Sequence, residues 1–363
     1  MVVTKENTSD SWNSFVKDER PSNLRVRAIF LENLSGPVLQ MLGAKFNIEP
    51  FFWSSSLNWI PSRYQEDPQA GTGDHITICL TFLRSMPSGT DAVRMDAGRS
   101  DKLLSLSSTN PSTLSESFHH LSKDIAMNTL KLNRPDDDRH PGTSAASTGC
   151  GQLLVLDLLS VHLIRSTEGS TIFSYHPSLP LPTTTAKDLQ RRIRFAGQSV
   201  YWQKMFQRSP DPTFVLLTFL WHALYAWDEA FEHLYMHICT LETKAIKTNE
   251  KQLTNELHII RAHQLHYSSL LANFTKTVEF IRDTRHPALE SMDKKTQKQT
   301  RHLMNRECLM LLNEIKRLDM TREMQDKRLK NVMNLVFSTV NIEDSSRMKE
   351  MTEAAVRDSA AVG

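Results

Sequence analysis

The chain has 363 residues, which is long enough for two domains and a sizeable core. Its 43 Lys and Arg residues nearly balance its 41 Asp and Glu residues, and the net charge of +2 gives no reason to expect nucleic acid or an anionic membrane as a partner. The cysteines stand alone, without a C-x-x-C pair, which favours a reducing compartment over a disulfide framework or a zinc ribbon. They are Cys79, Cys150, Cys239 and Cys308.

Two features of the sequence bear on the compartment. Charged residues are mixed into the start of the chain, so no secretory signal is visible. The longest apolar runs, Leu153–Ile164 and Phe214–Trp227, are interrupted by polar residues and fall short of the roughly twenty residues needed to cross a bilayer. As given, the sequence predicts a cytoplasmic chain.

The first part of the chain predicts strands and short helices. Residues 1–22 are polar and are expected to be disordered. Leu24–Leu31 alternates apolar and basic residues, which predicts a half-buried strand. Gly36–Phe46 follows a possible Ser cap, has Pro in its first turn, and predicts a helix. The aromatic, turn-rich segment Pro50–Glu66 leads into Asp74–Arg84, whose alternation predicts a strand.

The composition then shifts to Ser, Thr, Pro, Asp and Gly. Two insertions near 85–117 and 132–150 cannot bury enough apolar surface to offset their ordering entropy, and they are expected to be disordered around a modest helix at Phe118–Leu130. Strands resume at Gln152–Ile164 and Thr171–Tyr175. Together, residues 23–206 predict a mixed α/β domain.

Everything after this domain predicts helix. The domain itself ends with the amphipathic segment Ala186–Phe206, which also predicts a helix, and residues 214–285 hold two long helices with a three-four apolar step, the first at Phe214–Lys247. After a loop at Pro287–Thr300, the final helix at 301–360 would span roughly 90 Å at 1.5 Å per residue. We expect an antiparallel bundle of three long helices, and the fold class is α+β or α/β with a helical arm and a stalk.

The final helix carries a heptad seam typical of a coiled coil. We predict that this seam mediates contacts between subunits. Arg322 and Gln325 make it polar in the middle, and beyond the last seam residue the step continues out of phase, which indicates a change of neighbours. The seam residues are Met304, Cys308, Leu311, Ile315, Leu318, Leu329, Val332 and Val336.

One local cluster has metal-ligand spacing. Glu229, His233 and His237 follow one another at intervals of four, so they lie on one helix face, and imidazole with carboxylate suits zinc better than magnesium. The alternative is that they form the polar face opposite the apolar seam of that helix. His263 and His266 on the second helix present the same alternatives. No cofactor is required by any motif.

Motifs for catalysis are missing. The sequence contains no P-loop, dinucleotide-binding, H-E-x-x-H or G-x-S-x-G motif, so we expect no enzyme activity. The basic groups Arg191, Arg192, Arg194 and Lys294, Lys295, Lys298 are interpreted as surface cations near helix ends. The aromatic group Phe51, Phe52, Trp53 and Trp59 is either an exposed partner patch or packing beneath a loop.

Three stretches carry a resemblance to a known family. FFWSSSLNWIPSRYQE with GDHITICLTFLR, then FLWHALYAWDEAFEHLY, and NLVFSTVNIEDSSRMKEMTEAAVRDSAA resemble the cytosolic part of CorA magnesium transporters, in particular the fungal CorA-like branch. The resemblance implies a homo-oligomer, a pentamer in the family. It also implies Mg²⁺ as a regulatory ion, held between neighbouring subunits by acidic residues. Asp136, Asp137 and Asp138 form an acidic run, interpreted as solvated.

The chain departs from this family at its end. The family's stalk continues into membrane helices with a Gly-Met-Asn signature, which occurs nowhere in this sequence. Transport by this chain alone is therefore not expected. Two hypotheses remain: a cytosolic regulatory and assembly domain of a CorA-like transporter, truncated before the pore and membrane-associated only through a missing segment or full-length partner, or a soluble coiled-coil interaction protein derived from that scaffold.

Overall fold

The protein is described here by a computed structural model that covers residues 8–17, 21, 24–32, 34–62, 73–88, 129–132, 151–166, 169–177, 183–247, 251–286, 289 and 292–362. In chain order the elements are α1 Thr8–Lys17, β1 Val26–Glu32, α2 Gly36–Phe46, α3 Pro50–Asn58, β2 Gly73–Pro87, β3 Leu130–Leu132, β4 Gln152–Ser166, β5 Ser170–His176, α6 Ala186–Gly197, α7 Val200–Arg208, α8 Thr213–Lys247, α9 Lys251–Asp283 and α10 Lys294–Val362. A mixed α/β sheet domain followed by long C-terminal helices confirms the predicted fold class.

The described strands form one five-stranded sheet in the order β1-β5-β4-β2, with β3 paired to the end of β4. β1 and β5 run parallel, and the other pairs are antiparallel. The four predicted strands are confirmed, but β2 continues to Pro87, so the predicted insertion does not begin at residue 85. β3 was not predicted. Its Leu130 and Leu132 are buried on either side of an exposed lysine, so the helix predicted to end at Leu130 does not include that residue.

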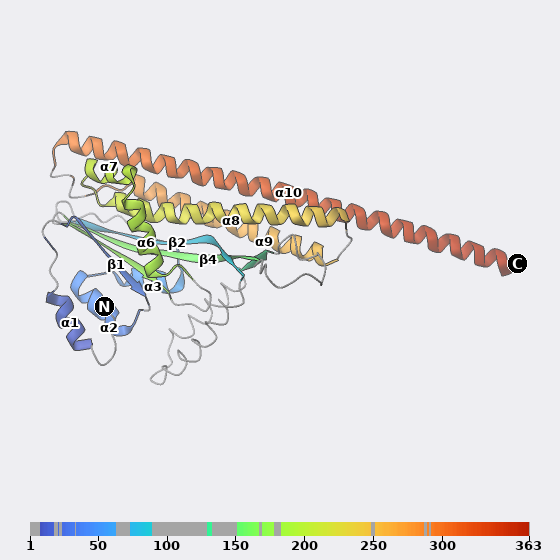
Figure 1. Cartoon of the computed structure of the whole chain (residues 1–363), viewed down its shortest axis with the longest axis horizontal. Helices are drawn as coiled ribbons and strands as arrows, with labels where there is room; N and C mark the ends of the chain where they lie inside the picture. The colour runs from blue at the N-terminus through green and yellow to red at the C-terminus, as the bar shows by residue number, and fades with distance from the viewer. Residues whose placement is uncertain are drawn as a thin grey trace, which may run out of the picture.

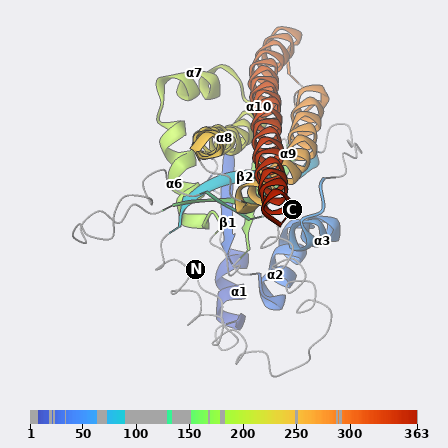
Figure 2. The ribbon, with the colours of Figure 1, turned by 90° about the vertical axis from the view of Figure 1, so that its right-hand side faces the viewer.

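Helices cover both faces of this sheet (Figures 1 and 2). On one face, α2 and α3 close a small core with strand β5 through Leu42, Phe52, Phe173 and Tyr175. On the other face, α6, α8 and α9 pack against the strands, and α10 lies outermost. One large core runs from the strands through α8 and α9 to α10. The division into domain, arm and stalk stays a prediction, because sheet and helices share this core.

The aromatic segment after α2 is helical where a turn-rich stretch was expected. Pro50–Asn58 forms α3, with Phe52 fully buried and Trp53 only 4% exposed against the sheet. Trp59 ends the helix in a left-handed conformation and is partly buried. The hypothesis of an exposed partner patch is therefore wrong for these rings, because the sheet face needs large apolar side chains to cover it.

The helix predicted at Ala186–Phe206 is in fact two helices. α6 ends at Gly197 and α7 begins after Ser199, whose side chain accepts a hydrogen bond from the Trp202 backbone N–H. Thr185 caps α6 in the same way, through the Asp188 N–H. The capping serine starts a new helix two residues after the first one ends, so the amphipathic pattern continues across a turn that the periodicity does not reveal.

The three long helices are arranged as layers. α8 and α9 run antiparallel on the sheet, and α10 packs along both of them, whereas α8 and α9 touch each other much less (Figure 2). The three predicted long helices are present and pack together, and the sheet supports α8 and α9 on their other side, which the prediction of a bundle did not include. α10 starts at Lys294, so the loop predicted at Pro287–Thr300 ends earlier. With 69 residues, α10 is roughly 100 Å long.

Candidate functional site

The predicted stalk seam lies in the groove between α8 and α9. Its eight residues are at most 6% exposed, and the set comprises Met304, Cys308, Leu311, Ile315, Leu318, Leu329, Val332 and Val336. A heptad pattern reports that a helix packs against other helices, but it does not say whether those helices belong to the same chain. Here they do, so the predicted use of this seam between subunits gains no support.

The two polar interruptions noticed in the sequence meet inside this groove. The Gln264 side-chain amide on α9 donates to the Gln325 side-chain oxygen at 3.1 Å, and the Gln325 amide donates to the Phe231 carbonyl of α8 at 2.8 Å. Both glutamines are at least 99% buried. Because a buried amide is costly without a partner, this level of the groove fixes the register of all three long helices.

Ion pairs flank the glutamine level on the partly exposed sides of α10. Arg317 contacts Asp228 of α8 at 2.9 Å. Arg328 forms an ion pair with Glu242 of α8 and also donates a hydrogen bond to the Tyr235 hydroxyl at 2.8 Å. These side chains are between about one third and one half exposed, so each pair adds modestly to stability. They hold α10 beside α8 at two levels.

The metal candidates do not form one group. Glu229 is exposed and lies 3.5 Å from the Ser85 hydroxyl of β2. His233 is half-buried, and His237 is buried and contacts the Glu256 carboxylate of α9 at 2.8 Å. His237 therefore pairs across the helices and does not join its neighbours along α8. Over the residues that the structure covers, no three His, Cys, Asp or Glu side chains are placed to hold a metal ion.

The second histidine pair lies on α9. His263 of α9 is buried and stacks on Tyr267, with ring centroids 5.9 Å apart. Burial lowers the pKa of both His263 and His266, so both are held in their neutral forms. The acidic run Asp136–Asp138 lies outside the described residues.

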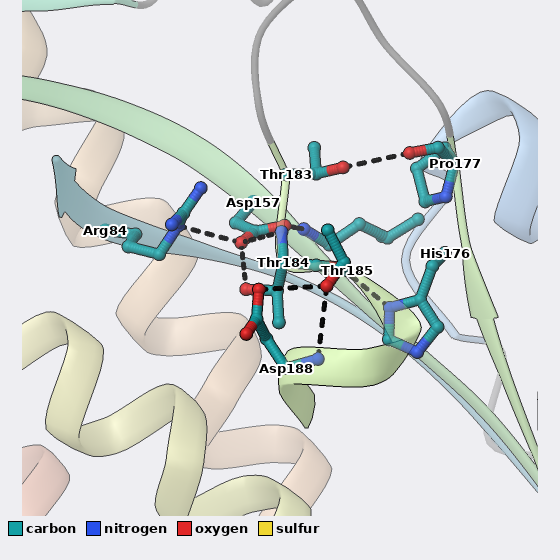
Figure 3. A network of polar contacts seen from close by, with 9 residues as sticks. Arg84, Asp157, His176, Pro177, Thr183, Thr184, Thr185 and Asp188 are labelled. Carbon is teal, nitrogen blue, oxygen red and sulfur yellow. Dashed lines mark hydrogen bonds and ion pairs between the residues drawn. The ribbon is translucent and has the colours of Figure 1, made fainter. Parts of the chain in front are cut away.

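A polar network that sequence reasoning missed lies between the sheet and α6 (Figure 3). Asp157 of β4 is fully buried, and its carboxylate accepts hydrogen bonds from the Thr184 N–H and hydroxyl. Arg84 of β2 approaches the same carboxylate at 3.0 Å. The network fastens the connection between β5 and α6 onto the middle of the sheet, and it compensates the charge of a carboxylate that burial alone would penalise.

Histidines flank this carboxylate. His176 of β5 hydrogen-bonds the Thr184 carbonyl at 2.8 Å and the Ser174 hydroxyl at 3.0 Å. His222 of α8 packs edge-on against Phe82 and is 7% exposed, and its Nε2 finds no partner among the described residues. Burial lowers the pKa of His222 to about 4. Ser174 and His176 resemble a nucleophile and base, but both are at least 97% buried, and a reaction needs access for its substrate.

One signal in the sequence could have located this network. Asp157 interrupts Leu153–Ile164, a mostly apolar run of the kind that forms a central strand. A charge inside such a run is seldom tolerated without a partner. The partners Arg84 and Thr184 are far away in sequence, so the sequence pattern indicates only that a partner exists.

The distal part of α10 has no such cover. The helix extends past the ends of α8 and α9, and Ile342, Met348, Met351 and Val356 are each between 63 and 73% exposed (Figure 1). Burial ends close to Val336, where the seam loses its phase, and the change of neighbours beyond it stays a prediction. Among the described helices, none combines the length and apolar character that a membrane span requires.

No family model matches the chain. No curated protein matches it either. Among solved structures it is similar to the complete structure of the CorA magnesium transporter from Methanocaldococcus jannaschii, with a TM-score of 0.46 and 10% identity over 90% of this chain and 73% of that chain. It is also similar to the soluble domain of CorA from the same organism, with a TM-score of 0.44 and 11% identity over 86% of this chain and 87% of that chain.

Proposed function

We propose that this chain is the cytosolic regulatory and assembly part of a CorA-like divalent metal ion transporter, with magnesium as the ion. The sequence resemblance motivates the proposal, and one structural observation carries it. α10 is packed by its own chain as far as Val336 and then continues as a single helix with large apolar side chains exposed. Most of the stability of a helix in a protein comes from packing of its apolar face, so the exposed distal segment needs a partner.

The proposed partner is the same segment of other copies. Met348 and Met351 lie three residues apart, so they share a helix face, and they are 67 and 73% exposed. Burying such side chains yields about 25 cal/mol per Å² of apolar surface, which favours a bundle of parallel distal helices. The proposal includes a homo-oligomer, and a pentamer follows from the resemblance alone.

Regulation in this proposal is a shift of population between stalk arrangements. A divalent ion that bridges two copies favours the arrangement in which its ligands are close, and the long helix transmits that preference along its axis. The proposal assigns no catalytic role to the chain. Its place is the cytosolic side of a membrane, next to a pore that this sequence does not itself supply.

A second candidate uses the same exposed segment. An interaction protein with a coiled-coil stalk would offer Ile342, Met348 and Met351 to a helix of another protein, without ion linkage. The exposed distal helix favours a helical partner in both cases. Response to the ion separates the two candidates.

The test is the mass of the purified chain by light scattering in millimolar magnesium and in EDTA. We expect an oligomer whose population changes with magnesium, and the double substitution Met348→Glu with Met351→Glu should yield a monomer. The matched control places two glutamates at exposed polar positions of the same segment, Ser345→Glu with Ser346→Glu, and should keep the oligomer. An oligomer of the same mass in magnesium and in EDTA would favour the second candidate. A monomer under all conditions would rule out assembly through α10.

A further inference from the structure

A second exposed feature lies far from the free end of α10. Helices α6 and α7 project at the side of α8, beside the beginning of α10 (Figures 1 and 2). Leu189 of α6 and Trp202 and Met205 of α7 are buried and hold both helices to the body. The Arg25 guanidinium donates to the carbonyls of Phe206 and Ser209 and ties down the end of α7. The outer face of this helix pair is therefore a fixed surface.

Three large apolar side chains stand exposed at the corner between the two helices. Phe195 is 77% exposed, Val200 67% and Tyr201 44%. They lie close in sequence across the short turn at Gln198 and Ser199. The Tyr201 hydroxyl donates to the Glu307 carboxylate of α10, which fixes this ring in place. Exposed apolar residues scattered singly need no explanation, but three grouped on a rigid corner indicate a contact surface.

Positive charge is concentrated around this corner. Residues 186–208 contain six Lys or Arg residues and one Asp, a net charge of +5, while the remaining chain holds 37 basic and 40 acidic residues, a net charge of −3. All six cations are exposed. They are Lys187, Arg191, Arg192, Arg194, Lys204 and Arg208. Among the described residues, the ion pair that these cations form is that of Arg191 with Asp188.

Helix geometry places the cations beside the apolar residues. Arg191 and Arg192 precede Phe195 by four and three residues, so all three share one face of α6. Lys204 follows Val200 by four residues on α7. An apolar centre with a charged rim, rich in aromatic and arginine side chains, is the usual composition of a protein interface.

We propose that this corner, defined as Phe195, Val200 and Tyr201 with the six surrounding cations, binds an acidic segment of another protein that carries a large apolar side chain. Complementary charge supplies attraction and orientation, and the apolar side chain packs on the corner. Three exposed side chains offer too little apolar area to hold a membrane surface.

The test uses the full chain and a fluorescein-labelled peptide with the sequence EDELFDEE as the probe. We expect saturable binding by fluorescence anisotropy that weakens as salt is raised. Arg191→Glu with Arg192→Glu should weaken binding at least tenfold, and Phe195→Ser should weaken it about fivefold at constant salt. The matched control, Lys294→Glu with Lys295→Glu, reverses an equal charge at the exposed start of α10 and should leave binding within about twofold.

Three results would overturn the proposal. One is the absence of saturable binding by a chain whose melting curve shows that it is folded. Another is an equal loss of binding in the control variant, which would reduce the effect to overall charge. The last is binding that favours a single-stranded oligonucleotide or phosphatidylserine vesicles over the peptide. Because the corner and the distal helix are separate surfaces, peptide binding and the mass measurement of α10 assembly can fail independently.

Discussion

The two halves of α10 are one continuous helix in two different environments. From Met304 to Val336 the seam residues are buried against α8 and α9, whereas from Ile342 to Val356 the large apolar side chains face solvent. Both halves contain apolar residues at helical spacing, so propensity and pattern do not separate them. The difference shows that the neighbouring layers, and not the helix itself, decide whether an apolar stripe becomes core or surface.

The strongest way to test this contrast is to remove one apolar side chain from each half. Leu318→Ala empties a fully buried position and should lower the free energy of unfolding by about 2–5 kcal/mol. Met351→Ala, at a position 73% exposed, should change it by less than about 0.5 kcal/mol in dilute monomer. Urea denaturation of both variants measures this. Equal losses would mean that the distal half is also packed in solution.

Acid should lower the stability of the buried core on which the first half of α10 packs. Burial lowers the pKa of His222 on α8 to about 4 from its ordinary value of 6.5, so between these values the unfolded chain binds a proton that the folded chain does not. Stability therefore falls as pH decreases from about 6.5 towards 4, by about 2–3 kcal/mol from this residue. His222→Phe keeps a ring against Phe82 and should flatten this part of the pH profile. The control His302→Asn, at an exposed position, should leave the pH profile unchanged. A profile that His222→Phe also leaves unchanged would contradict the assignment of this pH dependence to His222.

The buried glutamine level sharpens the contrast further. Gln325→Leu leaves the Gln264 amide without its partner and should cost about 1–3 kcal/mol. Replacing both glutamines by leucine removes the unpaired group and should restore most of that loss. A double-mutant cycle from urea denaturation gives the coupling between the two residues. Additive losses would show that the pair is not formed in solution.

The smallest expected effect concerns the ion pairs at the edge of the groove. Arg328→Ala removes contacts with Glu242 and Tyr235 on a side of α10 that is about one third exposed, and it should cost about 0.5–1 kcal/mol. The loss should shrink in high salt, because exposed charges are screened. The same substitution at Arg347, which pairs with Glu343 on the uncovered half, should cost less. A larger loss at Arg347 would reverse the contrast.

Much of the fold could be predicted because its signals are local. The alternation in Asp74–Arg84 and the three-four step in α8, α9 and α10 depend on residues a few positions apart, and the structure confirms those elements. Three features were not predictable in this way. The break between α6 and α7 depends on one capping serine, α3 on a sheet face that needs aromatic cover, and β3 on pairing with a strand that lies further along the chain.

The candidate site was less predictable than the fold. Glu229, His233 and His237 share a helix face, but His237 turns to Glu256 on another helix, and spacing along one helix cannot show this competition. Arg84, Asp157 and Thr184 lie on different elements and meet only through strand pairing and the path of the connection after β5. A sequence pattern marks such a residue as unusual without naming its partners.

The sequence alone determined the main strands and the long helices, the polar interruptions at Gln264 and Gln325, and the place where the seam of α10 loses its phase. These follow from periodicity, which is a property of neighbouring residues. Only the tertiary structure decided that the seam packs against its own chain, that the two glutamines pair, and that Asp157 is compensated inside the sheet. Each of these depends on which distant surfaces come together, because burial and charge compensation are set by contacts across the fold.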